Sequence, residues 1–402
     1  MAQTSARTRR PDAAAGIVIA LCFAVAIPEG YDLQAIGVAA PRLIPALHLA
    51  KAETGWTFSA SLFGLIVGAM IGGWLADRVG RRPVLVGSVA AFGLFSLATV
   101  LSTDFDSLFL WRLTTGLGLG GAMPNLIAMA REISSPQRRA LTSSMMFAAL
   151  PVGGAGAALF ARYGAHDWRD IFVLGGIVPL VLAALVAWKL PETRPPGAAR
   201  ATPDRNSLHA LFAQGRAPVT LALWAAFILT NIIVYLLLNW LPTLAVAKGL
   251  GASSALFTSV GFNLGGIAGA LLLALAVDAL GPRAPMAAGY GGLVAVMIAL
   301  AFAHGFAPIV LLSAAGGFLA LGVQYILYGL TPTYYAAVTR GTTAGAAVGV
   351  GRVGSILGPL VGGSLLGAGA SASAVAFAMA PVALAAGATV LLLTFVGRTH
   401  PD

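Results

Sequence analysis

Apolar runs long enough to cross a lipid bilayer follow one another along almost the whole chain, separated by polar connections that are mostly short. A membrane-spanning helix needs about 20 mostly apolar residues, and the runs reach that length. The pattern therefore predicts an all-α membrane protein with twelve transmembrane helices, near residues 14–40, 54–76, 83–102, 108–130, 140–162, 169–189, 218–241, 253–277, 284–303, 307–332, 342–368 and 372–396.

The longest polar connection divides these runs into two sets of six. It is rich in arginine and contains a Pro-Pro-Gly sequence, which is typical of a linker. We expect an N-terminal six-helix bundle over residues 1–190, a cytoplasmic linker over 191–217 and a C-terminal six-helix bundle over 218–402.

The two halves of the sequence also repeat. One shift along the chain carries Asp77 to Asp278 and Arg82 to Arg283. These matches are informative because charged residues are scarce in this chain. Each set holds an even number of helices, so the second set enters the membrane with the same orientation as the first. The repeat therefore predicts two pseudo-symmetric bundles related by an axis along the membrane normal, as in two-bundle secondary transporters.

Composition supports the membrane assignment, because 58% of the residues are hydrophobic and only 9% are charged. Soluble proteins are about 25% charged. The net charge of +10 could indicate nucleic-acid binding, but the arginines lie in short clusters between apolar runs, so we expect no nucleic-acid partner. Most Lys and Arg residues fall in alternate connections, which the positive-inside rule assigns to the cytoplasm together with both termini. The sequence shows no nucleophile–base set, nucleotide-binding loop or metal-ligand spacing, so we expect neither an enzyme nor a cofactor or metal.

Two carboxylates, Glu29 and Asp32, lie inside the first apolar run. A charge at the bilayer centre costs about 2.5–3.5 kcal/mol on insertion scales, so such residues usually mark an ion or substrate path. Positions i and i+3 lie on one side of a helix, so we expect both acids to point into one cavity. This pattern predicts a proton-handling site in a membrane carrier. The alternative is a static ion pair that fixes helix packing.

Two arginines also fall inside predicted helices. Arg352 lies about ten residues into the eleventh run, or roughly 15 Å at helical rise, near the middle of the membrane. A cation there needs an anion, which is either a substrate carboxylate or a permanent partner in Glu29 or Asp32. Arg112 begins the fourth run, where it either pairs with Asp32 or snorkels to the interface.

The connection after the second run reads Gly73-Trp74-Leu75-Ala76-Asp77-Arg78-Val79-Gly80-Arg81-Arg82 and resembles the signature loop of the major facilitator superfamily. Asp77 can accept hydrogen bonds from an arginine or from the N-terminus of an opposing helix, and so hold the cytoplasmic side closed. The alternative is a positive-inside anchor without a gating role. We expect the cytoplasmic gate to contain Asp77, Arg78, Gly80, Arg81, Arg82, Asp278, Arg283 and Arg340.

Further segments extend the resemblance over nearly the whole chain. Glu29-Gly30-Tyr31-Asp32, Pro124-Asn125, Asn239-Trp240-Leu241-Pro242 and Gly351-Arg352-Val353-Gly354 are similar to segments of the aromatic acid:proton symporters of that superfamily. They most resemble the branch of bacterial 3-(3-hydroxyphenyl)propionate transporters. Many relatives carry Asp-Gly-x-Asp in the first span, whereas this chain has Glu29 at the first acid.

The resemblance implies residue roles as well as a function. It assigns proton coupling to Asp32, with Glu29 and Arg112 beside it. Polar and aromatic residues at helical spacing in the seventh and tenth runs suit a phenolic ring, although they could instead form interhelical hydrogen bonds. We expect the substrate to contact Arg352, Asn125, Asn231, Tyr235, Gln324 and Tyr328.

The implied function is proton-coupled uptake, by alternating access, of an aromatic carboxylate such as 3-(3-hydroxyphenyl)propionate or a related phenylpropionate or hydroxybenzoate. The proton gradient supplies the driving force. We expect a monomer that spans the bacterial inner membrane many times, with the aromatic acid, protons and the lipid bilayer as its partners. The alternatives are a proton-driven exporter of small organic acids or drugs and a non-transporting membrane receptor for aromatic acids.

Overall fold

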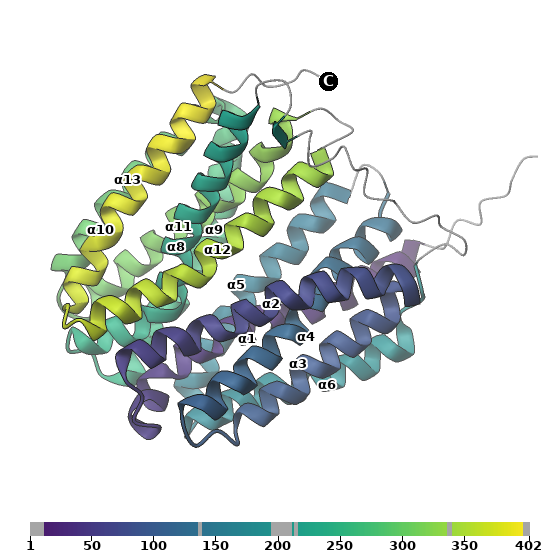
Figure 1. The fold of residues 1–402 in the computed structure, drawn as a ribbon, viewed down its shortest axis with the longest axis horizontal. Helices are drawn as coiled ribbons and strands as arrows, with labels where there is room; N and C mark the ends of the chain where they lie inside the picture. The colour runs from purple at the N-terminus through teal and green to yellow at the C-terminus, as the bar shows by residue number, and fades with distance from the viewer. Residues whose placement is uncertain (1–11, 136–138, 194–210, 213–215, 336–339, 397–402) are drawn as a thin grey trace, which may run out of the picture.

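The computed structural model describes residues 12–135, 139–193, 211–212, 216–335 and 340–396. These residues form twelve long α-helices and one short 3-10 helix, η3 (Thr331–Tyr334), without a β-strand among them (Figure 1). The long helices are α1 (Asp12–Ala46), α2 (Lys51–Val79), α3 (Arg81–Thr99), α4 (Phe105–Ile133), α5 (Arg139–Tyr163), α6 (Trp168–Lys189), α8 (Ala217–Ala247), α9 (Ala252–Leu280), α10 (Arg283–Phe302), α11 (Phe306–Leu330), α12 (Arg340–Gly367) and α13 (Ala372–Val396).

Eleven of the described helices are long and apolar enough to cross a membrane. The twelfth is α4, which is less apolar because it carries Arg112, Asn125 and a run of glycines. Its 29 residues span about 44 Å, more than the hydrocarbon thickness of about 30 Å. The predicted all-α membrane fold is confirmed, and α4 owes its low hydropathy to residues that it buries against other helices.

Local sequence explains where helices begin and end. Asp104 precedes α4 and its side chain accepts a 2.8 Å hydrogen bond from the backbone N–H of Ser107, which satisfies one of the unpaired donors of the first turn. This bond and those from the side chains of Ser107 and Thr103 lower the pKa of the Asp104 carboxyl. Gly80 and Gly281 separate α2 from α3 and α9 from α10, and both adopt the positive φ that glycine tolerates best. Sequence-equivalent turns in the two halves thus have the same geometry.

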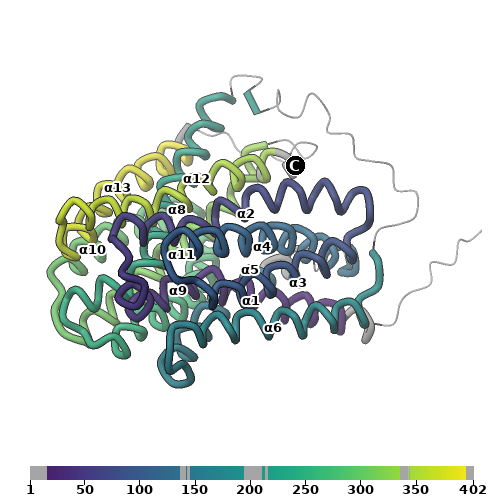
Figure 2. Tube along the Cα trace, turned by 60° about the horizontal axis from the view of Figure 1, so that its bottom comes forward, coloured from purple at the N-terminus to yellow at the C-terminus, as the bar shows by residue number. Residues whose placement is uncertain are grey.

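The helices form two groups, α1–α6 and α8–α13, which lie side by side (Figures 1 and 2). In the first group a Cβ atom on Gly64 of α2 would lie 2.0 Å from the Leu113 carbonyl oxygen of α4. In the second, a Cβ atom on Gly265 of α9 would lie 2.0 Å from the Ala314 carbonyl oxygen of α11. Glycine thus allows the same close backbone approach in both halves, which explains part of the repeat in the sequence.

The two groups meet closely at the end where α1 joins α2 and α8 joins α9, which we call the closed end. There Ser59 of α2 donates a 2.8 Å hydrogen bond to the Ile356 carbonyl of α12. The rings of Phe58 and Trp240 pack edge to face, 4.9 Å apart. Toward the other end, where α2 joins α3 and α9 joins α10, a cavity of about 610 Å³ separates α5 from α9 and α11. We call this end the vestibule end.

Candidate functional site

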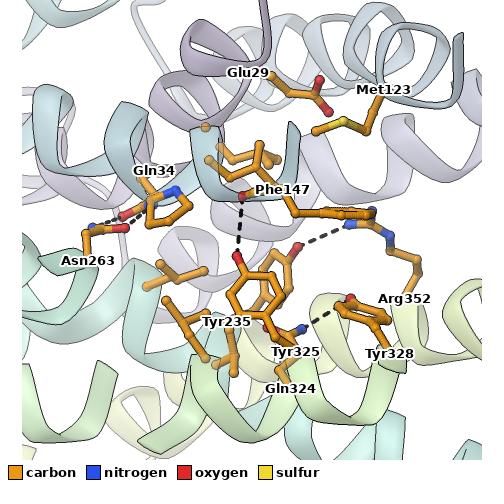
Figure 3. A pocket seen from close by; sticks show the side chains of 17 residues that line it. Glu29, Gln34, Met123, Phe147, Tyr235, Asn263, Gln324, Tyr325, Tyr328 and Arg352 are labelled. Carbon is orange, nitrogen blue, oxygen red and sulfur yellow. Dashed lines mark hydrogen bonds between the residues drawn. The ribbon is translucent and has the colours of Figure 1, made fainter. Parts of the chain in front are cut away.

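A narrow cavity of about 70 Å³ lies between the two groups, lined by residues of α1, α4, α5, α8, α9, α11 and α12 (Figure 3). Its polar lining consists of Glu29, Gln34, Tyr235, Asn263, Gln324, Tyr325, Tyr328 and Arg352. Phe147, Pro151, Tyr325 and Tyr328 line both this cavity and the vestibule. These four residues therefore lie between the central polar groups and the vestibule.

Arg352 projects into this cavity from α12. Gly354, two residues on, allows α12 to pack directly on α8, because a Cβ atom there would lie 2.1 Å from the Ile228 carbonyl oxygen. The Arg352 guanidinium donates a 3.1 Å hydrogen bond to the Tyr235 hydroxyl. Among the described residues no carboxylate oxygen lies within 4 Å of its nitrogens. Arg352 is thus a cation on the cavity wall without an ion-pair partner from the described part of the chain.

Hydrogen bonds hold the neighbours of Arg352 in place. The Gln324 amide nitrogen donates to the Asn231 side-chain oxygen at 2.5 Å and to the Tyr328 hydroxyl at 3.5 Å. Asn231 in turn donates to the Gly351 carbonyl at 2.9 Å. Three predicted contacts, Tyr235, Gln324 and Tyr328, therefore line the cavity, whereas Asn231 lies behind them.

Asn125 does not line the cavity, although we expected it to contact substrate. Its side chain donates a 2.8 Å hydrogen bond to the Gly121 carbonyl one turn earlier in α4. This bond lies next to Pro124, whose ring nitrogen supplies no backbone donor. In this conformation Asn125 stabilises its own helix.

Glu29 lines the cavity from α1 and is 3% exposed. The adjacent Gly30 brings α1 close to α5, since a Cβ atom there would lie 2.1 Å from the Leu150 carbonyl oxygen. The Oε2 atom of Glu29 is buried and has no hydrogen-bond partner among the described residues. Figure 3 shows its carboxyl group beside Met123, on the opposite side of Phe147 from Tyr235.

Asp32 does not line the cavity, so the expectation that both acids point into one space is wrong. Successive helical residues turn by about 100°, so positions i and i+3 still differ by about 60°. That angle directs Asp32 toward α3 and α4. Its carboxylate accepts bonds of 3.0 and 2.8 Å from Arg112 and 3.1 Å from the Ser96 hydroxyl.

Arg112 also donates a 3.1 Å bond to the backbone carbonyl of Asp32. Both side chains are fully buried. The alternative in which Arg112 snorkels to the membrane interface is therefore wrong, because the residue lies inside the first helix group with a bidentate partner.

Two predicted gate residues of the first half, Arg81 and Arg82, bond to residues of their own helix group. The backbone amides of Arg81 and Arg82, at the start of α3, donate to the Glu192 carboxylate at 3.1 and 3.2 Å. Arg81 pairs with Glu132 at 2.9 Å, and Arg82 donates to the Ala187 carbonyl. These contacts fix the turn at Gly80 against the end of α6.

The five other predicted gate residues lie elsewhere. Arg78 lies over the Trp74 ring at 3.7 Å, and Asp77 makes no hydrogen bond or ion pair with the described residues. Asp278 lines the vestibule, and Arg283 donates a 2.8 Å bond to the Thr394 carbonyl. The side chain of Arg340 lies outside the described residues. The gating role of all these residues stays a prediction.

Sequence reasoning missed several residues of the cavity wall. Gln34 and Asn263 exchange two hydrogen bonds across it, of 2.9 and 2.7 Å. Helical spacing from Tyr235 was the signal for Asn231. An amide inside an apolar run is the signal that could have found Asn263. Phe147 and Tyr325 carry no such signal, because aromatic residues are common in membrane helices.

The chain matches the family model of the Major Facilitator Superfamily over residues 22–347. It is 42% identical over 391 residues to the 3-(3-hydroxyphenyl)propionate transporter of Escherichia coli K12, a match that covers 96% of each chain. It is also 33% identical to the gallate transporter of Pseudomonas putida, covering 93% of this chain and 91% of the relative.

Solved structures show the same fold. A bacterial homologue of the human lysosomal transporter Spinster, in an inward-facing and occupied conformation, superposes with a TM-score of 0.77 at 18% identity, covering 96% of this chain and 99% of that one. A D-xylose–proton symporter also gives 0.77, at 17% identity, covering 94% and 97%. The family match, these relatives and the helical architecture agree: the chain is a member of the major facilitator superfamily of membrane transporters.

Proposed function

We propose that the protein takes up an aromatic carboxylate together with protons, with 3-(3-hydroxyphenyl)propionate or a related phenylpropionate or hydroxybenzoate as substrate. The observation that carries this proposal is Arg352, a guanidinium on the wall of the central cavity without a carboxylate partner among the described residues. The names of the relatives in Escherichia coli and Pseudomonas putida point to the same chemical class.

The cavity suits a ligand with an anionic end and an aromatic body. A carboxylate can accept two parallel hydrogen bonds from a guanidinium, and such pairs are among the strongest in proteins. Beside Arg352 lie the rings of Phe147 and Tyr328, stacked at 5.8 Å, which offer apolar faces to an aromatic ring. The cavity and vestibule together fall in the size range of about 300–1,000 Å³ that is typical of small-molecule sites. Binding in the central cavity would separate Phe147 from Tyr328.

Glu29 is the better candidate for the coupled proton. Asp32 could bind a proton only by giving up bonds to Arg112, which would leave that buried cation without compensation. Glu29 lines the substrate cavity and has a buried oxygen without a partner, so it can gain or lose a proton without breaking an existing ion pair. This assignment differs from the resemblance, which favoured Asp32.

The distribution of positive charge supports a membrane orientation with both termini in the cytoplasm. In that orientation the vestibule end faces the cytoplasm, and the conformation is one in which substrate and proton would leave inward. We propose a monomer in the bacterial inner membrane, with residues 191–217 as a cytoplasmic linker between two six-helix bundles.

The test is uptake of radiolabelled 3-(3-hydroxyphenyl)propionate by proteoliposomes, with and without an inward proton gradient. The wild-type protein should accumulate the acid above equilibrium only with the gradient. Glu29→Gln should lose gradient-driven accumulation but retain exchange of internal for external substrate, because exchange requires no net proton movement.

The matched control is Asp106→Asn, which removes an exposed carboxylate in the first turn of α4. It should accumulate substrate like the wild type. Full accumulation by Glu29→Gln would remove that residue from the mechanism. Wild-type uptake that does not depend on the proton gradient would contradict symport. Gradient-driven movement of the acid out of the proteoliposomes would favour the exporter.

A further inference from the structure

The hydrogen-bonded amides of Gln34 and Asn263 form a second polar group in the central cavity, away from Arg352. Gln34 comes from α1 of the first helix group and Asn263 from α9 of the second. Both side chains line the cavity and are buried. Figure 3 shows them on one side of Phe147, with Arg352 on the other. The cavity therefore has two polar ends with an aromatic side chain between them.

The hydrogen bonds fix how the two amides are turned. Asn263 donates one bond to the Ser259 carbonyl at 2.8 Å and another to the Gln34 oxygen at 2.7 Å, which uses both hydrogens of its nitrogen. Its oxygen accepts from the Gln34 nitrogen at 2.9 Å. Each carboxamide oxygen of the pair thus accepts one hydrogen bond from the described residues and keeps a second lone pair.

The packing around Gln34 holds its amide in this position. A Cβ atom on Gly154 of α5 would lie 1.9 Å from the Gln34 nitrogen, so the absence of a side chain at that position makes room for the amide. Asn263 is held from the other side by its bond to Ser259. The two oxygens are therefore fixed acceptors, which is the arrangement that discriminates best between ligands with and without a donor.

We propose that the Gln34–Asn263 pair recognises a hydroxyl group on the aromatic ring of the substrate. This inference rests on the proposed function, because it assumes that the carboxylate binds at Arg352. With the anionic end there, the ring would extend into the cavity that Phe147 and the two amides also line. A phenolic hydroxyl donates its hydrogen to the free lone pair of one of the two oxygens. A ring without a donor leaves that lone pair without a ligand partner at two buried side chains.

The first test varies the ligand and leaves the protein unchanged. Proteoliposome uptake is compared for 3-(3-hydroxyphenyl)propionate, its 3-amino analogue, which also donates a hydrogen bond, and its 3-fluoro and unsubstituted analogues, which do not. Vmax/KM should be about tenfold higher for the two donors than for the other two acids, the size expected of one buried hydrogen bond. Equal values for all four acids would overturn the inference while leaving aromatic-acid uptake intact.

The second test removes the pair. The double variant Gln34→Leu/Asn263→Leu replaces both amides together, so neither is left buried without its partner. Uptake of unsubstituted 3-phenylpropionate should continue, and the roughly tenfold preference for the hydroxylated acid should disappear. Tyr290→Phe is the matched control, because it deletes a buried hydroxyl bonded to Thr230 outside the cavity, and it should keep the preference.

Two results would overturn the inference. An unchanged preference in the double variant would show that the amides do not contact the ring substituent. An equal loss of uptake for both acids would show that the pair acts only as a contact between the helix groups. If the wild-type protein takes up none of the four acids, the proposed function itself fails and this inference fails with it.

Discussion

The two arginines inside the membrane helices have opposite surroundings. Arg112 makes three hydrogen bonds to Asp32, two to its carboxylate and one to its backbone carbonyl, and it is fully buried within the first helix group. Arg352 lies on the cavity wall between the groups and, among the described residues, makes one hydrogen bond, to the Tyr235 hydroxyl. Its nitrogens have no carboxylate within 4 Å in the described part of the chain.

The difference distinguishes an arginine whose charge is compensated by a carboxylate of the chain from one whose charge is available to a ligand. Removing an ion from water costs several kcal/mol, and a bidentate carboxylate with further hydrogen bonds offsets that cost. For Arg112 the chain itself supplies the compensation through Asp32. For Arg352 the described residues supply no carboxylate within 4 Å, and we propose that the substrate supplies the anion.

The two acids of α1 divide in the same way. Asp32 belongs to the ion pair of the first group, whereas Glu29 belongs to the cavity. A single helix therefore places one carboxylate in a buried ion pair and the other on the cavity wall.

The largest expected effect comes from breaking the ion pair. Arg112→Leu leaves the Asp32 carboxylate buried without its cation, so the free energy of unfolding should fall by about 3–5 kcal/mol. Reversible unfolding of the purified protein in detergent measures this change. Arg352→Leu is the matched control and should unfold close to the wild type, since it breaks no ion pair among the described residues.

A double variant sharpens this result. Asp32→Asn/Arg112→Gln replaces the buried ions with two neutral amides and should recover part of the lost stability. If Arg112→Leu were as stable as the wild type, the view of this pair as a structural element would be wrong.

The next effect concerns substrate binding at Arg352. Arg352→Gln removes the cation that we expect to bind the substrate carboxylate, and hydrogen bonds to charged groups are worth about 1.5–3 kcal/mol. Vmax/KM for 3-(3-hydroxyphenyl)propionate should therefore fall roughly 10- to 150-fold. Arg352→Lys keeps the charge but loses the planar fork, so its loss should be smaller.

The control for this series is Arg131→Gln, which removes an exposed arginine in the last turn of α4 and should leave uptake unchanged. An unchanged KM in Arg352→Gln would show that the carboxylate binds elsewhere. In that event another anion would have to pair with the Arg352 guanidinium. The contrast with Arg112 would then no longer indicate a substrate site.

The fold was predictable from the sequence because the bilayer imposes a strong pattern. Apolar runs of sufficient length predicted all twelve helices. The close glycine contacts of α2 with α4 and of α9 with α11 were found only in the structure. Helix ends were less accurate. The sequence placed the end of the first helix near residue 40, but α1 continues to Ala46 through Pro41 and Pro45, which lie in its last turns.

The site was only partly predictable, because spacing along a helix does not fix which neighbour a side chain meets. A difference of about 60° was enough to give Glu29 and Asp32 different partners. Asn125 illustrates the same limit, since its amide bonds to its own helix instead of lining the cavity. The Gln34–Asn263 pair depends on two residues 229 positions apart, and their proximity follows from the packing of the two helix groups.

The smallest expected effect concerns the hydroxyl of Tyr235, the one described side-chain group that bonds to the Arg352 guanidinium. Tyr235→Phe removes this neutral hydrogen bond and keeps the ring. A net contribution of about 0.5–1.5 kcal/mol corresponds to a rise in KM of roughly 2- to 10-fold. Tyr31→Phe deletes a buried hydroxyl bonded to the Ile171 carbonyl, away from the cavity, and should leave KM unchanged. If Tyr235→Phe lowered Vmax/KM as much as Arg352→Gln, the Tyr235 hydroxyl itself would contact the substrate carboxylate. The carboxylate would then bind to two groups, and Tyr235 would do more than orient the Arg352 guanidinium.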